Sequence, residues 1–294
     1  TAKGKAIVNI LPIPVGVSIA AIMPVDVDEK EWDNLQIVFA TSAGDIRRNA
    51  LSDFTNVRSN GKIAMDLNEG IELVNARIAG EDDDVMLFTD SGRAIRFSTT
   101  AVRVFKGRKS TGVRGIKLLG KDKVVSMSVI RHFIATPDER SAYLKMRRAV
   151  SGLVDEEGIS DEDDVNENAT ISPERYAEMS ASENLILTIT SGGAGKLSSS
   201  HDYPVRGRGG MGVAAMDKTM RGGAIVASFP VELEDQIMLA TSNGQSIRVP
   251  VEGISFRSRS AGGVKVFDTK EKEEVVSVAW IADQADEAEE GSPE

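Results

Sequence analysis

The sequence predicts an all-β protein in which small four-stranded sheets follow one another in a propeller-like array. Three observations lead to this prediction. A hairpin phrase occurs four times, a second series of glycines opens short apolar segments, and two of the steps between successive glycines of that series span 51 residues. A period of roughly 40 to 50 residues is typical of propellers, whose blades are four-stranded.

The hairpin phrase has the form Thr-x-x-Gly, with apolar residues before it and a basic residue soon after it. Each copy follows an apolar run such as IVFA or VMLF, which is typical of a strand that enters a tight turn whose glycine takes a positive φ. A hydrophobe stands ten residues after every one of these glycines, so the copies are in register. The copies lie at residues 41–44, 89–92, 190–193 and 241–244.

The second glycine series marks a short segment after each hairpin. Each glycine precedes an apolar stretch such as KIAMDL at 62–67, and a longer strand such as IELVNARI at 71–78 comes next. An ordinary β-sandwich with similar hairpins is the alternative, but a sandwich has no reason to keep several repeated residues at constant spacing.

From the number of glycines in the second series we expect about five blades within residues 1–282. The glycines are Gly4, Gly61, Gly112, Gly212 and Gly263.

An insertion interrupts the array between residues 131 and 184, because the step from Gly112 to Gly212 is 100 residues instead of 51. Proline at the first helical position predicts helices that begin near 137 and 173, so we expect one or two helices. The segment between them, residues 155–168, is too acidic and too poor in aromatic side chains to bury itself, which predicts a mobile loop.

Composition limits the environments in which this chain works. It has no cysteine, which excludes disulfides and thiolate metal sites and suits a cytoplasmic protein. No apolar run approaches the roughly 18 to 20 residues of a membrane span, and no signal peptide is evident. The first residue is not Met, so we expect a fragment of a longer protein. We expect the isolated domain to be monomeric.

The charge distribution favours a polyanionic partner despite a net charge of −10. Residues 155–183 and 268–294 together hold 21 of the 45 acids but only 3 of the 35 bases. The remaining body therefore has 32 basic and 24 acidic residues, a net charge of +8. A basic body with acidic flexible parts suggests nucleic acid as the partner and built-in competitors for its surface. The acidic segment 283–294 is expected to be a disordered tail. One interpretation is that it only keeps the chain soluble, and the other is that it lies against the basic rim and competes with DNA.

Basic residues recur three or four positions after the hairpin glycines and just ahead of the second glycine series. The alternative is that exposed Lys and Arg merely keep the strands soluble. Because the units repeat, we expect these residues to form a curved stripe that contacts phosphates. The candidate residues are Lys3, Lys5, Arg47, Arg48, Arg58, Lys62, Arg96, Lys106, Arg108, Lys109, Arg114, Lys196, Arg206, Arg208, Arg248, Arg257 and Arg259.

Catalytic chemistry is not indicated. His132 and His201 lack metal-ligand spacing, so neither a metal site nor a cofactor is expected. Tyr203 stands ten residues after a hairpin glycine and is expected to pack in the core. The acidic run 81–84 is expected to be a solvated loop ahead of a strand, and the glycine-rich stretch 192–196 is expected to be a turn.

Seven segments, in order and spacing, resemble the C-terminal domain of the DNA gyrase A subunit. The similarity extends through nearly the whole chain except the insertion and the acidic end. The seven segments are GKAIVNILPI (4–13), FATSAGDIRR (39–48), VRSNGKIAM (57–65), VMLFTDSGRAIRF (85–97), STGVRGIKL (110–118), DKVVSMSV (122–129) and QIMLATSNGQSIRV (236–249).

The resemblance implies a β-pinwheel, a propeller relative whose blades exchange strands, with a basic rim that wraps duplex DNA. It further implies partnership with gyrase B and with the rest of the gyrase A subunit in ATP-dependent negative supercoiling, in the bacterial cytoplasm at the nucleoid. The catalytic tyrosine of that family lies outside this domain. The equivalent domain of topoisomerase IV and a propeller-type protein-interaction scaffold remain alternatives.

One departure concerns the signature loop of the family, Gln-Arg-Arg-Gly-Gly-Lys-Gly. The resemblance places this loop in a blade upstream of Thr1, so we expect this chain to lack it together with the opening part of the pinwheel. Residues 206–212 match the signature at four positions and are expected to act as a degenerate copy. The insertion at 131–184 is a second departure, and it affects the DNA path near that blade.

Overall fold

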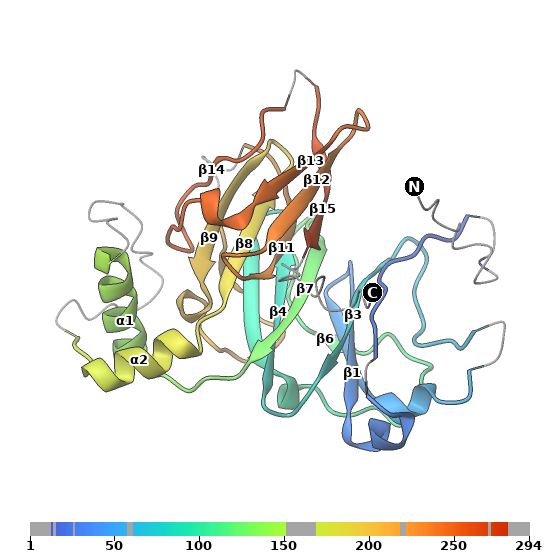
Figure 1. Ribbon diagram of the computed structural model, residues 1–294. Coiled ribbons are helices and arrows are strands. Elements are labelled where there is room, and N and C mark those ends of the chain that lie inside the picture. The colour runs from blue at the N-terminus through green and yellow to red at the C-terminus, as the bar shows by residue number, and fades with distance from the viewer. Residues whose placement is uncertain are drawn as a thin grey trace, which may run out of the picture.

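Four small antiparallel sheets follow one another in a curved array in the computed structural model, and two helices project from one side (Figure 1). The structure describes residue 13 and residues 16–25, 27–57, 61–150, 169–217, 222–269 and 272–281. The predicted all-β, propeller-like class is confirmed. Four sheets are described where the sequence predicted about five blades, and the segment after Gly4 lies outside the described residues.

Each sheet is built around one predicted hairpin, and the long strand that follows pairs with the first hairpin strand. In the first sheet, β1 (Gln36–Thr41) and β2 (Asp45–Ala50) form the hairpin, β3 (Leu73–Ala79) pairs with β1, and β6 (Val113–Arg114) pairs with β2. In the second, the hairpin is β4 (Asp83–Thr89) and β5 (Arg93–Ser98), flanked by β7 (Val124–Arg131) and β10 (Val213–Ala214).

The third and fourth sheets repeat this plan, but the fourth has three strands among the described residues. The third contains β8 (Leu185–Thr190), β9 (Ala194–Ser199), β11 (Ile225–Val231) and β14 (Val264–Lys265). The fourth contains β12 (Gln236–Thr241), β13 (Ser246–Pro250) and β15 (Val275–Ile281). The inner strands β3, β7, β11 and β15 contact one another in that order.

The threonine of the hairpin phrase closes the turn that the glycine makes possible. In all four copies its hydroxyl accepts the amide of the residue after the glycine, at 3.2 to 3.3 Å. The four glycines have φ between 78° and 89°, a region that L residues rarely adopt. This local hydrogen bond explains why Thr and Gly recur three positions apart.

The predicted strand exchange is confirmed, because the outer strands β6, β10 and β14 come from the following repeat. The register is the same each time: the second residue after the hairpin glycine pairs with the first residue after the second-series glycine. A Cβ at Gly112 would lie 2.3 Å from the carbonyl oxygen of Ile46, and one at Gly212 would lie 2.3 Å from that of Ala94. Glycine is therefore required where the exchanged strand meets its host.

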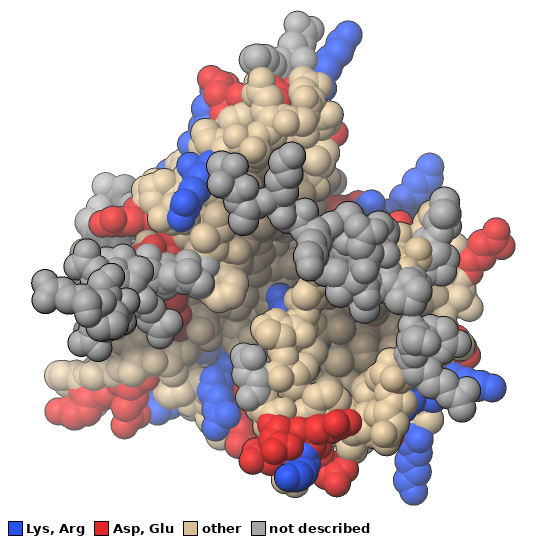
Figure 2. Space-filling model, turned by 45° about the vertical axis from the view of Figure 1, so that its right-hand side comes forward, with Lys and Arg blue, Asp and Glu red and all other residues tan. Residues whose placement is uncertain are grey.

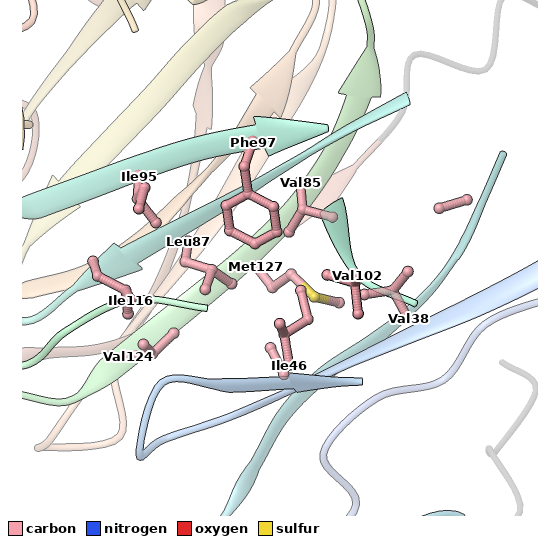
Figure 3. Packing of buried hydrophobic residues seen from close by; sticks show 12 residues of the cluster. Val38, Ile46, Val85, Leu87, Ile95, Phe97, Val102, Ile116, Val124 and Met127 are labelled. Carbon is pink, nitrogen blue, oxygen red and sulfur yellow. The ribbon is translucent and has the colours of Figure 1, made fainter. Parts of the chain in front are cut away.

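Strand alternation places apolar side chains on both faces of each inner sheet. In β4, Val85 and Leu87 pack against the first sheet (Figure 3), whereas Met86 and Phe88 pack against the third. A comparable cluster joins the third sheet to the fourth, and another covers the outer side of the first. The blades are thus held together face to face as well as by strand exchange.

Both described helices lie within the predicted insertion, between β7 and β8. Helix α1 (Pro137–Val150) begins with a capping box, in which Thr136 and Glu139 each accept the other's backbone amide, at 3.2 and 2.7 Å. Helix α2 (Pro173–Ala181) is capped by Ser172, whose hydroxyl accepts the amide of Arg175. The acidic stretches 155–168 and 283–294 lie outside the described residues.

We predict that Leu87→Ala lowers the free energy of unfolding by about 2 to 5 kcal/mol, because Leu87 is fully buried between the first two sheets. Urea denaturation followed by circular dichroism measures this loss. Leu119→Ala is the matched control, because Leu119 is 52% exposed, and it should leave stability nearly unchanged. Equal losses for the two variants would contradict the assigned packing.

Candidate nucleic-acid interface

The basic residues are positioned by linkers that cross from one sheet to the next. After each hairpin the chain makes a short 3₁₀ turn: η3 (Leu51–Phe54), η4 (Thr99–Ala101), η5 (Ser200–Asp202) or η6 (Val251–Gly253). After η4, η5 and η6 the linker runs beside the outer hairpin strand of the preceding sheet, forming the bridges Arg48 to Val104, Arg96 to Val205 and Leu197 to Phe256. The linkers therefore line the outer edge of the array, and what they cover becomes buried.

The structure divides the seventeen candidate residues into four groups. Exposed are Lys106, Lys109, Arg114, Arg206, Arg208 and Arg248. Half-buried are Lys62, Arg108 and Arg257. Buried are Arg47, Arg48, Arg96, Lys196 and Arg259. Outside the described residues are Lys3, Lys5 and Arg58.

Arg96 is the clearest of the buried cations. Its side chain is 3% exposed, its Nε lies 2.8 Å from Asp84 Oδ2, and its Nη1 donates to the carbonyl of Ser200. Asp84 is also buried, and its other oxygen lies 2.8 Å from His132 Nδ1. Burial lowers the pKa of Arg96 below its usual value while the Asp84 charge opposes this, and a guanidinium stays charged at neutral pH. The ion pair joins β5 to β4, the bond from Arg96 to Ser200 joins β5 to η5, and the contact of Asp84 with His132 joins β4 to the residue after β7.

Lys196 has a similar structural role in the third sheet. Its ammonium group donates to the carbonyls of Ser258, Arg259 and Ala261 at 2.6 to 2.8 Å, and its side chain is fully buried. Three carbonyls match the three donors of an ammonium group. Lys196 therefore fixes the linker of the fourth repeat onto the third sheet.

Of the remaining buried arginines, Arg47 and Arg48 lie beneath a linker, whereas Arg259 belongs to one. Arg47 donates to Asn49 and to the carbonyl of Ser110, and Arg259 donates to the carbonyls of Asp202 and Ala214. Burial lowers the pKa of Arg48, with Glu81 acting in the opposite direction.

The expectation that these five cations lie on the exposed rim is wrong. Arg47, Arg48, Arg96 and Lys196 lie beneath linkers, and Arg259 belongs to one. Four of the five donate to protein groups, whereas Nε and Nη1 of Arg48 are buried without a hydrogen-bond partner among the described residues. The acidic run 81–84 also departs from the prediction of a solvated loop, because Asp83 and Asp84 belong to β4 and Asp84 is buried.

Apart from Arg248, which belongs to β13, the exposed cations lie on linkers that contact each other. Arg208 Nε donates to the carbonyl of Ala101, and its Nη1 donates to that of Arg114. The backbone continues this contact, since Gly209 donates to Gly115 and Lys117 donates to Gly210. The linker of the third repeat is thus laid directly on that of the second, which places basic residues of two blades along one path.

Two exposed cations of this path were not among the residues predicted from the sequence. Arg103 stacks on the Phe105 ring, with its Cζ 3.9 Å from the ring centroid, and Lys117 lies just beyond β6. Both belong to the linker that already supplied Lys106 and Lys109, so a charge count over that whole linker, residues 99–117, would have included them. Figure 2 shows basic and acidic side chains along the outline of the molecule, with a group of acidic side chains at the lower edge of that view.

The inserted helices lie against the outer edge of the third sheet. Helix α1 contacts η5, and Arg147 of α1 lies over the Phe256 ring, with its Cζ 4.7 Å from the centroid. His201 of η5 is buried by this contact, between the rings of Phe133 and Tyr143, and its Nε2 lies 2.8 Å from the carbonyl oxygen of Met179. The insertion therefore covers part of the linker region that the other sheets expose.

The described residues hold no group of three or more His, Asp or Glu side chains placed to bind a metal ion. Tyr203 packs in the core as predicted: its hydroxyl bonds to Ser198, and burial raises its pKa to about 12. Across the same described residues, neither helix is long and apolar enough to span a membrane.

Comparison with protein families and curated proteins gives consistent matches. The family model of the DNA gyrase C-terminal domain, a β-propeller, matches residues 36–79, 83–131, 184–232 and 235–279, one segment for each sheet. The DNA gyrase A protein of Granulibacter bethesdensis is 46% identical over 95% of this chain and 31% of that protein. The DNA gyrase A protein of Rickettsia bellii is 41% identical over 99% of this chain and 32% of its own length. The chain thus spans about a third of these relatives.

Two solved structures share the fold. The C-terminal domain of DNA topoisomerase IV superposes with a TM-score of 0.68, at 20% identity, over 94% of this chain and 70% of that one. The DNA gyrase A C-terminal domain gives a TM-score of 0.60, at 20% identity, over 85% and 67%. At this identity the likeness concerns the fold alone.

We predict that Arg96→Met lowers the free energy of unfolding by about 3 to 5 kcal/mol, because it leaves the Asp84 carboxylate buried with its charge uncompensated. Adding Asp84→Asn should recover part of the loss. Denaturant titration of the single and double variants measures both effects. Arg114→Met is the control on an exposed cation and should leave stability unchanged, and an equal effect there would contradict a structural role for Arg96.

Stability should also depend on His201. Burial lowers its pKa below the usual value of about 6.5, so the unfolded chain binds the proton more readily. Below pH 6.5 this removes stability as the pH falls, by up to about 1.4 kcal/mol per pH unit. The unfolding free energy between pH 7.5 and 5.5 should therefore fall less in His201→Gln than in the parent, and identical slopes would contradict the assignment.

Proposed function

The chain belongs to the DNA gyrase C-terminal domain family, and we propose that it binds duplex DNA and bends it along its exposed basic linkers. In a whole gyrase A protein this wrapping assists ATP-dependent negative supercoiling with gyrase B, in the bacterial cytoplasm at the nucleoid. The chain itself is non-catalytic in this proposal, and the tyrosine that cleaves DNA lies outside it. The isolated domain acts as a monomer.

The contact between successive linkers carries the proposal. Arg208 bonds to the carbonyls of Ala101 and Arg114, so its guanidinium lies beside the linker that presents Lys106 and Lys109. Cations of neighbouring blades are therefore neighbours in space, although they lie about a hundred residues apart in the sequence. A path of this kind supports contact with several successive phosphates.

The chemistry of the path favours phosphate contact over base reading. Its exposed groups are Lys and Arg on glycine-rich loops, which suit backbone positioning and carry little sequence information. Bending 20 to 30 base pairs costs on the order of 1 to 6 kcal/mol, which attraction between the curved cation path and the phosphates can offset. We expect weak sequence preference and a steep dependence on salt.

The equivalent domain of topoisomerase IV, which would bind DNA without strong wrapping, is the second candidate function, and the shared fold favours it. Ligation of nicked circles in the presence of the chain separates the two, because a wrapping domain leaves a topological shift after deproteinisation and a binding domain does not. A protein-interaction scaffold is the third candidate, and it predicts no salt-dependent DNA affinity.

We predict that the double variant Lys106→Gln, Lys109→Gln weakens binding to any duplex sequence and lowers the slope of log affinity against log salt by up to about 2, close to one unit for each phosphate that the protein no longer neutralises. Fluorescence anisotropy with two unrelated duplexes over a salt series measures both quantities.

Arg77→Gln is the matched control, because Arg77 is exposed but lines the central cavity between the inner strands. It should leave the salt slope unchanged. Salt-independent, sequence-selective binding by the parent chain would overturn the mechanism. If Arg77→Gln lowered the salt slope as much as the double variant does, the linker would not be the surface that contacts DNA.

A further inference from the structure

Successive linkers are joined by an arginine at a constant position. It stands four residues before a second-series glycine, and its Nη1 donates to the carbonyl of the second residue after the preceding glycine of that series. Because the same bond occurs at three junctions, it is part of the repeat. The three bonds run from Arg108 to Ile63 at 3.1 Å, from Arg208 to Arg114 at 3.1 Å and from Arg259 to Ala214 at 2.6 Å.

A backbone hydrogen bond forms a second contact at each junction. The amide of the fifth residue after a second-series glycine donates to the carbonyl two residues before the next glycine of the series. Two bonds at separate points restrain rotation as well as separation, so together they set the angle between successive linkers. The backbone bonds run from Asp66 to Ser110 at 3.4 Å, from Lys117 to Gly210 at 2.8 Å and from Asp217 to Ala261 at 3.3 Å.

Burial separates this role of the arginine from direct contact with phosphate. Arg208 is exposed and Arg108 is half-buried, whereas Arg259 is only 1% exposed and still makes the same bond. A side chain buried to that extent does not reach a phosphate. The property that the three arginines share is therefore the bond to the preceding linker.

The guanidinium group suits this junction because it donates in several fixed directions at once. At two junctions Nε adds a bond to the 3₁₀ turn of the preceding linker, from Arg208 to Ala101 of η4 and from Arg259 to Asp202 of η5. Lysine has the same charge but only one compact ammonium group on a flexible stem. An Arg→Lys change therefore separates the geometry of the bond from the charge.

We propose that Arg108, Arg208 and Arg259 are positioning residues, each of which fixes the angle of its linker on the preceding one and so sets the curvature of the basic path. The part that concerns DNA rests on the proposed function. A path with fixed curvature is preorganised for a bent duplex. Linkers that pivot on each other would neutralise the same phosphates without holding the bend.

Hydrogen exchange of the 294-residue chain tests the junctions without DNA. In Arg208→Lys, the amides of Gly209 and Lys117 should exchange about tenfold faster than in the parent, because both bond across the junction that Arg208 holds. Arg108→Lys should have the same effect on the amide of Asp66. Exchange is followed residue by residue by NMR, and circular dichroism shows that each variant is folded.

DNA bending tests what the junctions do. Fluorescence energy transfer between the ends of a duplex of about 30 base pairs measures the bend, and anisotropy over a salt series measures the salt slope. Arg208→Lys should lower the gain in transfer by about twofold and leave the salt slope unchanged, because the charge is kept. Arg77→Lys is the matched control at an exposed arginine of the central cavity, and it should change neither exchange at the junctions nor bending.

Unchanged exchange in Arg208→Lys and Arg108→Lys would overturn the proposal. Faster exchange with undiminished bending would also overturn it, because the bonds would then have no part in the DNA path. If the parent chain bends no DNA, the proposed function fails, and the exchange result alone decides whether these arginines position the linkers.

Discussion

The exchange of short outer strands is the constraint on which the rest of this structure depends. No sheet is completed by its own repeat, because β6, β10 and β14 each arrive from the next one. The pairing of Ile46 with Val113 closes 67 residues of chain, whereas that of Ala94 with Val213 closes 119 because the insertion lies between them. The register is nevertheless identical. The insertion lies between β7 and β8, so it lengthens the chain between the two paired strands without changing the sheets themselves.

Strand exchange also explains why so many cations are buried. An exchanged strand needs a linker that crosses the outer face of its host, and that linker brings carbonyl groups over the residues three and four positions after the hairpin glycine. Arg47 and Lys196 donate to such carbonyls, and Arg96 reaches both a carbonyl and Asp84. Bonding of these buried donors matters because an unpaired charge in the interior costs several kcal/mol. Arg48 is the exception, since its Nε and Nη1 are buried without a hydrogen-bond partner among the described residues. In these places the basic residues assemble the array rather than bind a ligand.

Local chemistry made the fold predictable, and long-range contacts limited the prediction of the site. The Thr-x-x-Gly phrase encodes a hydrogen bond within one turn, and the second-series glycines mark one close backbone contact. Because each depends on only one or two residues, both can be recognised in the sequence. Burial of Lys196 depends on carbonyls more than sixty residues away, and burial of Asp84 depends on Arg96 in the paired strand. Spacing alone does not distinguish a cation under a linker from one upon it, as the contrast between Arg96 and exposed Arg248 illustrates.

The linkers differ in charge along the array, and this difference directs the proposed DNA path. The linker of the second repeat exposes Arg103, Lys106, Lys109, Arg114 and Lys117, and that of the third exposes Arg206 and Arg208. In the linker of the fourth repeat, Arg259 is buried, Arg257 is half-buried, and Arg147 of the inserted helix lies on Phe256. Since attraction to phosphate needs accessible charge, contact should be strongest along the first two sheets and weaken toward the third. A duplex that follows this gradient meets the insertion at the third sheet, where α1 rather than the linker determines how closely it approaches.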